Sequence, residues 1–253
     1  MDRACVCITG STHGIGLAIA EAFAHTGARL VINSHVPDEA ALAHLSALTE
    51  CHFIQADMST VDGARKFVDE AHARLGRLDT LVNNAGTFRD VDFAQLSEAC
   101  FSETFNLNVR GYLFAAQAFA AYVVPGRTGA SIVCIGSTNS LAAEKNSVIY
   151  DASKGAVLML IRSLAVTLAP QGIRVNGLGP GIVETPLTAA GLAAPGVRQA
   201  LTAQIPLGRL GSPSDIGAAA VFLASAGASY ITGQMLYIDG GVLANQMTWE
   251  VRP

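Results

Sequence analysis

The sequence predicts an α/β protein in which a doubly wound parallel sheet lies between two layers of helices. Short apolar runs alternate with longer helical stretches, and strands separated by helices form right-handed βαβ units with a parallel sheet. The strands are apolar on both faces, as expected where helices cover both sides of a sheet. No linker, composition break or repeat divides the 253 residues, so we expect one domain over residues 1–253.

Each expected element follows from a local pattern. Seven apolar runs predict strands at residues 4–8, 29–32, 52–55, 78–82, 131–135, 173–178 and 235–238. Longer stretches predict helices at residues 15–25, 39–48, 61–75, about 101–123, 150–168 and 213–224. Ser212 suits the N-cap of the last helix, and Pro213 suits its first position. Residues 179–206 hold four prolines and predict a long, partly helical excursion of the kind that forms lids or binding loops.

Composition excludes several classes of protein. With 51% hydrophobic and 14% charged residues, the chain is too apolar to be intrinsically disordered. The net charge of −4 and only three lysines argue against nucleic acid as a partner, because phosphate binding needs clustered Lys and Arg. No signal peptide and no clean apolar run of about 18 residues is visible, so we expect no membrane association and a cytoplasmic location. Five cysteines without a CxxC pair indicate buried thiols in a reducing compartment.

A glycine-rich segment with the spacing Gly-x-x-x-Gly-x-Gly follows the first predicted strand and opens the first helix. Glycines at such a junction permit a tight turn, and they let backbone N–H groups approach a pyrophosphate at the positive end of the helix. Glycine turns also occur for steric reasons alone, so the position at the first βα junction is what favours a dinucleotide site. The segment consists of Gly10, Ser11, Thr12, His13, Gly14, Ile15 and Gly16.

The second predicted strand ends without a carboxylate. In many dinucleotide folds an acidic residue about 20 positions after the loop binds the ribose 2′-OH, whereas here Ser34 and His35 stand near that place. A 2′-phosphate would meet less repulsion there, and His13 and His35 could both reach it. Both can equally be ordinary loop histidines, since neutral histidine binds phosphate less well than arginine. We therefore expect NAD(P)(H) as cofactor, with a slight preference for NADP over NAD.

Tyr150 and Lys154 stand four residues apart on a predicted helix and so share one face. A phenol with a pKa of about 10 is a poor base at neutral pH, and a nearby ammonium group lowers that pKa. Tyr150 could then exchange a proton with a substrate oxygen that the Ser137 hydroxyl orients. Tyr-x-x-x-Lys occurs by chance on many helices. The combination with Ser137, the glycine segment and the asparagines after the fourth strand, Asn83 and Asn84, is what indicates a reaction site.

With these motifs the sequence resembles the short-chain dehydrogenase/reductase family from Thr9 to Gly241. The resemblance implies a Rossmann fold and an oxidoreductase that interconverts a secondary alcohol and a ketone by hydride transfer. It implies that Tyr150 is the general acid/base and that Lys154 binds the nicotinamide ribose and lowers the pKa of the tyrosine. It further implies that Ser137 holds the substrate oxygen and that Asn108 supports a proton relay.

The resemblance also assigns the cofactor contacts. Asp57 would meet the adenine, and Thr185 would meet the carboxamide. Because the family usually forms tetramers or dimers through its two longest helices, a homotetramer or a homodimer is expected. Besides the glycine segment, the expected nucleotide site comprises Ser34, His35, Asp57, Met58, Asn84, Ala85, Gly86, Tyr150, Lys154, Pro180, Gly181, Val183 and Thr185.

Other classes of protein fit less well. Ser137 is not in a Gly-x-Ser-x-Gly motif and no histidine follows His72, which disfavours a serine hydrolase. No His-Glu-x-x-His motif is present, so we assign no metal ligand, and the absence of Gly-Lys-Ser/Thr disfavours a P-loop NTPase. A redox-inactive dinucleotide sensor on the same fold is the alternative of another class. Such a protein would be expected to lack one of the four residues assigned to the reaction, whereas Asn108, Ser137, Tyr150 and Lys154 are all present.

The substrate is a small alcohol or ketone whose identity stays open. Glu144, Lys145 and Asn146 offer hydrogen bonds that suit a sugar or polyol, or they form a solvated turn. A 3-oxoacyl or hydroxyacyl compound, or a steroid, is the alternative substrate. We expect residues 140–146 and 181–194 to form the substrate pocket. Trp249 is expected to pack on the body or on a neighbouring subunit rather than on substrate.

Overall fold

The computed structural model describes residues 3–124 and 129–245, and within these ranges seven strands form one sheet. They are β1 (Cys5–Ile8), β2 (Arg29–Ser34), β3 (Cys51–Gln55), β4 (Thr80–Asn83), β5 (Ala130–Ile135), β6 (Ile173–Pro180) and β7 (Met235–Ile238). Neighbouring strands all run parallel, in the order β3-β2-β1-β4-β5-β6-β7. The central strands β1, β4 and β5 are buried along their whole length, as expected for a sheet covered on both faces.

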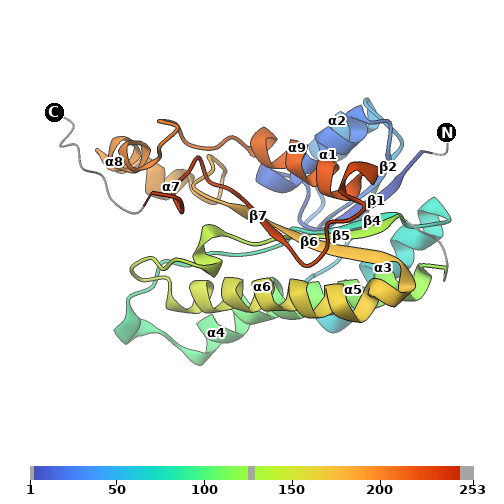
Figure 1. Cartoon of the computed structure of the whole chain (residues 1–253), viewed down its shortest axis with the longest axis horizontal. Helices are drawn as coiled ribbons and strands as arrows, with labels where there is room; N and C mark the ends of the chain where they lie inside the picture. Colours follow the sequence, from blue (N-terminus) through green and yellow to red (C-terminus); the bar gives the residue numbers. More distant parts are fainter. Residues whose placement is uncertain (1–2, 125–128, 246–253) are drawn as a thin grey trace.

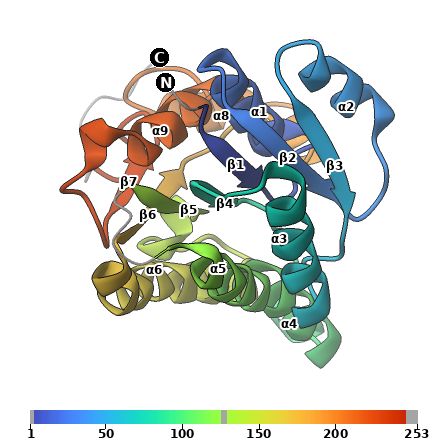
Figure 2. The ribbon, with the colours of Figure 1, turned by 90° about the vertical axis from the view of Figure 1, so that its right-hand side faces the viewer.

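Helices form a layer on each face of the sheet. Their bounds are α1 (Gly14–His25), α2 (Glu39–Ser46), α3 (Val61–Leu75), α4 (Glu98–Phe105), α5 (Gly111–Tyr122), α6 (Val148–Leu168), α7 (Ala189–Leu192), α8 (Val197–Gln204) and α9 (Pro213–Ala224). One apolar core lies between the sheet and α1, α2 and α9, and the other lies between the sheet and α3, α5 and α6 (Figures 1 and 2). Short helical turns join these elements at η1 (Phe93–Gln95), η3 (Thr138–Ser140), η4 (Ala169–Gln171) and η5 (Ala226–Ala228).

The chain winds outward in both directions from the centre of the sheet. β1, β2 and β3 follow one another toward one edge, after which the chain crosses back and β4 to β7 extend toward the other edge. The connections that leave β1 and β4 therefore diverge, and a crevice forms beyond the carboxyl ends of these two strands. The strand order by itself thus places the residues after β1 and β4 at a potential ligand site.

The predicted fold class is confirmed. The expected strands and helical regions are all present, with small differences at their ends. Ser212 takes the N-cap position of α9 and Pro213 the first helical position, as expected, and the Ser212 backbone N–H donates to the Asp215 carboxylate at 2.7 Å. The expected excursion at 179–206 is partly helical and contains α7 and α8.

The prediction of one continuous helix at about 101–123 is wrong in one respect. α4 ends at Phe105, and a wider π-helical turn, η2 (Asn106–Arg110), separates it from α5. α5 then starts at Gly111, where an added Cβ would overlap the carbonyl oxygen of Met58. The helix therefore approaches the loop after β3 more closely than a side chain would allow. Such turns are frequent at functional sites, and this one carries Asn108.

The segment Val148–Gln171, which contains α6, is long and apolar enough to cross a membrane on length and composition alone. The sequence analysis found no clean apolar run of about 18 residues and predicted no transmembrane helix, and a single segment that meets this criterion does not contradict that prediction. In the fold, however, Val157 and Ile161 of α6 are completely buried against the sheet side of the core. A core helix with one buried face and one apolar outer face meets the same length and composition criterion.

Candidate active site

A cleft of about 630 Å³ opens at the carboxyl ends of the strands. Residues that follow β1, β2, β3, β4, β5 and β6 all contribute to its lining. The cleft therefore lies where the strand order predicts a ligand site. Most of the expected nucleotide residues line it: Gly10, His13, Gly14, Ile15, Gly16, Ser34, His35, Asp57, Met58, Asn84, Ala85, Gly86, Tyr150, Lys154, Pro180, Gly181, Val183 and Thr185.

The glycine segment forms a cradle in which Gly10 and Gly16 leave no room for a side chain. Gly10 and Gly14 have φ angles of 58° and 56°, in the left-handed region that favours glycine. A Cβ on Gly10 would lie 2.8 Å from the Cα of Ala85, and one on Gly16 would lie 2.5 Å from the Nδ2 of Asn84. α1 begins at Gly14, so the positive end of the helix faces this space. These features fit the pyrophosphate of a dinucleotide.

Two expected cofactor residues, Ser11 and Thr12, are buried and do not line the cleft. The Ser11 hydroxyl donates to the Ile8 carbonyl oxygen at 2.7 Å and accepts the Asn33 N–H at 3.0 Å. Asn84 holds the same loop from the other side, because its Nδ2 donates to the Gly10 carbonyl oxygen at 2.7 Å. Ser11 and Asn84 therefore fix the shape of the cradle by joining β1, β2 and β4.

The end of the cleft beyond β2 and β3 carries little fixed charge. His13, Ser34, His35 and Asp57 line it, and both histidines and Asp57 are exposed. Arg89, the arginine among the described lining residues, is paired with Glu103 at 2.6 Å. In this part of the lining a 2′-phosphate would therefore meet no repelling carboxylate directly after β2. It would also find no unpaired arginine among the described lining residues.

Tyr150 and Lys154 of α6 face the cleft together with Ser137, which follows β5. Lys154 is buried, its Nζ donates to the Ile135 carbonyl oxygen at 2.9 Å, and it lies 5.5 Å from the centre of the Tyr150 ring. Burial lowers the pKa of Lys154 to about 8, because a charged ammonium group loses its hydration there. The proximity of these side chains matches the prediction from their spacing.

The pKa of Tyr150 does not show the lowering by Lys154 that the sequence predicts. Burial raises the pKa of Tyr150 to about 12, and the negative charges of Glu144 and Asp151 raise it further. The neighbouring Ser137 side chain acts in the opposite direction and lowers the pKa of Tyr150. The tyrosine is therefore a protonated acid in the free protein, and its environment must change before it can act as a base.

Asn108 lies in the π-helical turn and is completely buried, outside the lining of the cleft. Its Oδ1 accepts the Thr87 N–H at 2.9 Å, and its Nδ2 donates to the Thr87 carbonyl oxygen at 3.0 Å and to the Ser153 hydroxyl at 3.1 Å. Both ends of the amide are thus used within the protein. The contacts show Asn108 joining the loop after β4 to α6, beside the reacting residues.

The expected substrate pocket is only half supported. Val183, Thr185 and Leu187 of the excursion line the cleft, but residues 140–146 are not among its lining. Within that segment the Asn146 carbonyl oxygen instead accepts the Val91 N–H at 3.0 Å. Sequence patterns also missed Phe88, whose ring meets the Tyr150 ring edge-on with centres 5.0 Å apart. Phe88 could have been found from the sequence, because it stands only two residues after Gly86 in the loop that follows β4.

Comparisons with known proteins agree with this geometry. A family model described as enoyl-(acyl carrier protein) reductase matches residues 10–243. L-Rhamnose 1-dehydrogenase (NAD(P)(+)) of Azotobacter vinelandii is 34% identical over 95% of this chain and 96% of its own. Galactitol 2-dehydrogenase (L-tagatose-forming) of Cereibacter sphaeroides is 38% identical over 95% of each chain. The structure of 3-oxoacyl-[acyl-carrier protein] reductase from Brucella melitensis in complex with NAD superposes with a TM-score of 0.92, at 31% identity and over 98% of this chain and 100% of that one.

The chain belongs to the short-chain dehydrogenase/reductase family. As a member of the short-chain dehydrogenase/reductases it is an NAD(P)-dependent oxidoreductase that acts on alcohol groups. The glycine cradle and the strand-end lining accommodate such a nucleotide without a basic surface. The relatives thus favour an enzyme over the redox-inactive sensor.

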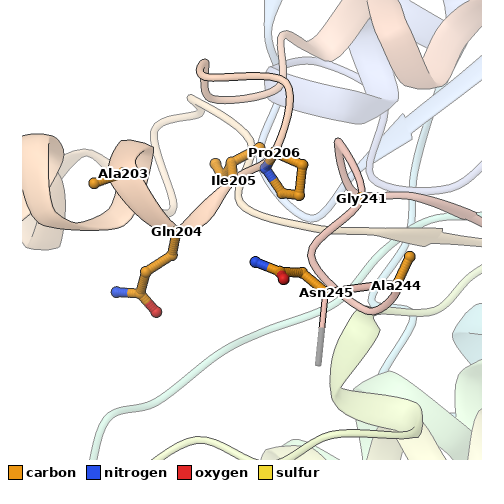
Figure 3. A pocket seen from close by; sticks show the side chains of 7 residues that line it. All are labelled: Ala203, Gln204, Ile205, Pro206, Gly241, Ala244 and Asn245. Atoms are coloured by element: carbon orange, nitrogen blue, oxygen red, sulfur yellow. The ribbon is translucent and has the colours of Figure 1, made fainter. Parts of the chain in front are cut away.

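A second hollow of about 450 Å³ lies between α8 and the segment after β7 (Figure 3). Its lining holds no titratable side chain: Ala203, Gln204, Ile205, Pro206, Gly241, Ala244 and Asn245. It therefore offers no acid or base, and we place the reaction in the larger cleft. Within residues 3–124 and 129–245, no group of three or more His, Cys, Asp or Glu side chains could hold a metal ion. Trp249 lies outside the described residues.

Proposed function

We propose that this short-chain dehydrogenase/reductase interconverts a secondary alcohol and a ketone of a sugar or polyol. The observation that carries the proposal is the placement of Tyr150, Lys154 and Ser137 at one cleft that also contains the glycine cradle. Relatives named for L-rhamnose and galactitol support a polyhydroxylated substrate. The segment at 179–206 would form the substrate-side wall, since Val183, Thr185 and Leu187 already line the cleft.

In this proposal each side chain has a separate task in alcohol oxidation. Tyr150 takes the hydroxyl proton of the substrate as the carbon–oxygen bond becomes a carbonyl, and it returns that proton in the reverse reaction. The positive charge of Lys154 favours the phenolate, and Ser137 holds the substrate oxygen beside Tyr150. A bound nicotinamide nucleotide supplies the hydride acceptor or donor. Asn108 keeps the loop after β4 in contact with α6 through Thr87 and Ser153.

We assign nucleotide contacts along the cleft in the same way. Gly14 and the start of α1 would meet the pyrophosphate, and Asp57 and Met58 would meet the adenine. Thr185 would meet the nicotinamide carboxamide. His13, Ser34 and His35 would lie near the 2′ position, where they favour NADP slightly over NAD. The remaining assigned contacts come from Gly10, Ile15, Gly16, Asn84, Ala85, Gly86, Pro180, Gly181 and Val183.

A 3-oxoacyl or hydroxyacyl thioester is the second candidate substrate. The close superposition on 3-oxoacyl-[acyl-carrier protein] reductase favours it, because the two chains cover one another almost completely. A panel of aldoses, polyols, hydroxy acids and 3-oxoacyl thioesters, each assayed with NAD and NADP, separates the candidates. Turnover of thioesters without turnover of any sugar or polyol would contradict the first proposal.

Tyr150→Phe tests the mechanism. It removes the phenol and keeps the ring that packs on Phe88, so kcat should fall about 10²- to 10⁴-fold while the Kd for the nucleotide, measured by fluorescence, changes little. Tyr122→Phe is the matched control, because Tyr122 lies on α5 and donates to Asp69 far from the cleft. Undiminished turnover of Tyr150→Phe would show that the mechanism is wrong.

We also propose that the enzyme is a cytoplasmic homotetramer or homodimer. Large apolar side chains are exposed on α4 and α6: Phe101 is 49% exposed, Met159 56% and Val166 79%. Large exposed apolar side chains on these helices favour a subunit interface there. The cysteines among the described residues are unpaired, which suits a reducing compartment. A stable monomer in sedimentation at assay concentration would contradict the assembly.

A further inference from the structure

We propose that Asp151 and Asn139 form a hydrogen-bonded brace that fixes the Ser137 hydroxyl, and that both are positioning residues for the reaction. The term "brace" refers to the chain of contacts from Asp151 through Asn139 to Ser137. The inference rests on the proposed function, because it concerns how Ser137 is held for a substrate oxygen. It adds two residues to the site that act through Ser137 rather than on the substrate.

The first half of the brace lies directly after β5. The Ser137 hydroxyl donates to Oδ1 of Asn139 at 3.0 Å, and the backbone N–H of Asn139 donates back to Ser137 Oγ at 3.1 Å. The serine oxygen is therefore held on two sides by one residue. A hydroxyl has one proton and two lone pairs, so these contacts fix the position of the Ser137 oxygen and use its proton. A substrate oxygen receives that proton when it takes the place of Asn139 Oδ1, while the Asn139 N–H still holds the serine oxygen.

The second half of the brace fixes Asn139. Its Nδ2 donates to Oδ1 of Asp151 at 2.7 Å, and that same carboxylate oxygen accepts the Ser147 hydroxyl at 2.7 Å. The other carboxylate oxygen accepts the Glu144 backbone N–H at 3.2 Å. A carboxylate only accepts hydrogen bonds, so the NH₂ group of Asn139 must face Asp151, and its carbonyl oxygen must face Ser137.

The surroundings make the brace stiff. Ser137, Asn139 and Ser147 are 7%, 8% and 1% exposed, and each side chain has a hydrogen-bond partner within the network. Hydrogen-bonded networks of this kind favour one arrangement, since breaking any contact at the buried members leaves an unpaired polar group. Asp151 also lies in the first turn of α6, directly after Tyr150. One carboxylate thus ties the segment that carries Ser137 to the turn of α6 that carries Tyr150.

The consequence is a fixed distance between the two groups that would contact the substrate oxygen. Rate depends steeply on such placement, because a displacement of about 1 Å can cost about 100-fold. Without Asn139 the Ser137 hydroxyl would turn freely, and without Asp151 the Asn139 amide could reverse. Both losses should reduce kcat, while nucleotide binding, which uses the other strand ends, should persist.

A double-mutant cycle tests this dependence. Asn139→Ala should lower kcat about tenfold in the wild-type background and should cause no further loss in the Ser137→Ala background, because its effect passes through Ser137. A further loss of similar size in the Ser137→Ala background would overturn the inference, since Asn139 would then act on substrate or on the fold. Circular dichroism and nucleotide affinity verify that each variant is folded.

The Asp151 variants add a readout in the pH profile. Glu144 and Asp151 are the acidic groups that act on Tyr150, and Lys154 is the neighbouring cation. Both acidic groups raise the pKa of Tyr150, so Asp151→Asn and Glu144→Gln should each move the acidic limb of alcohol oxidation to lower pH. Only Asp151→Asn, and more strongly Asp151→Ala, should also lower kcat, because the Glu144 side chain makes no contact in the brace.

An unchanged kcat in Asp151→Ala, whether or not its melting temperature falls, would overturn the inference without touching the proposed function. Failure of the proposed function itself is distinguishable, because it would appear as activity in Tyr150→Phe. The two hypotheses therefore have separate experiments on the same assay.

Discussion

The two ends of the cleft differ in how firmly their side chains are held. At the reacting end Ser137, Asn139 and Lys154 are buried and hydrogen-bonded to the protein. At the end beyond β2, His13 and His35 are exposed and their rings lie free of any acidic partner in the described contacts. A buried, satisfied site tolerates few changes, whereas an exposed one can change its preference at small cost. The reaction should therefore be sensitive to substitution and the choice of nucleotide adjustable.

Lys154→Met gives the largest expected effect. It removes the charge that favours the phenolate, so kcat should fall about 10³-fold, comparable to the loss of a strong electrostatic contact in other enzymes. The Ile135 carbonyl oxygen keeps the Tyr112 hydroxyl as a partner at 3.2 Å, which protects the fold. A fall in kcat of less than about tenfold would contradict the expectation that the reacting end of the cleft is more sensitive to substitution than the end beyond β2.

The same variant should be more stable than the wild type at pH 7. Burial lowers the pKa of Lys154 from 10.5 to about 8, so below pH 8 the folded protein carries the full cost of a buried charge. Between about pH 8 and 10.5 the unfolded chain holds the proton more tightly than the folded one, and wild-type stability rises relative to the variant. Urea unfolding should therefore show that the free energy of unfolding of the variant exceeds that of the wild type by less at pH 9.5 than at pH 7. A difference in free energy of unfolding that grows with pH would contradict the conclusion that Lys154 carries a buried charge.

Gly16→Ala should weaken nucleotide binding as a whole, because the cradle would hold the pyrophosphate that joins the two halves of the nucleotide. The added Cβ would overlap the Gly10 carbonyl oxygen, and the loop must move. Overpacking of this kind costs about 1–3 kcal/mol, which corresponds to a fall in nucleotide affinity of about 5- to 150-fold. Gly155→Ala is the matched control, since its Cβ would meet no atom within 4 Å. Equal nucleotide affinities in the two variants, by titration calorimetry, would argue against the cradle.

Ser34→Asp tests the adjustable end. A carboxylate after β2 should repel a 2′-phosphate and accept the 2′-OH of NAD, so the ratio of NADP to NAD affinity should fall about tenfold. Ser46→Asp adds the same charge at an exposed position on α2 and serves as control. If kcat with NAD also collapsed in Ser34→Asp, the two ends would not be independent.

His35→Arg should have the smallest effect, in the opposite direction. Arginine binds phosphate with two parallel hydrogen bonds and keeps its charge at every assay pH, so NADP affinity should rise about threefold while NAD affinity stays the same. The two dissociation constants, measured side by side by nucleotide fluorescence, check this. An equal gain for both nucleotides would place the histidine away from the 2′ position.

Much of the site could be predicted because its signals are local. Tyr150 and Lys154 share a face as a matter of helix geometry, and the glycine segment stands at a strand-to-helix junction that apolar periodicity already marks. The parallel sheet then brings the ends of β1, β4 and β5 to one edge. Residues on separate motifs thus meet without any knowledge of side-chain packing.

The sequence by itself therefore determined the α/β class and the order of the elements, and it supplied the residues that we propose for the reaction, since these depend on short-range periodicity and spacing. Only the tertiary structure decided that Asn108 sits on a π-helical turn facing Thr87, and that burial raises the Tyr150 pKa. It also decided that Asp151 holds Asn139. These features depend on which segments, distant in the sequence, pack together and bury one another's side chains. They also depend on which polar side chains then come within hydrogen-bond distance. Such contacts join residues whose separation along the chain carries no periodic signal.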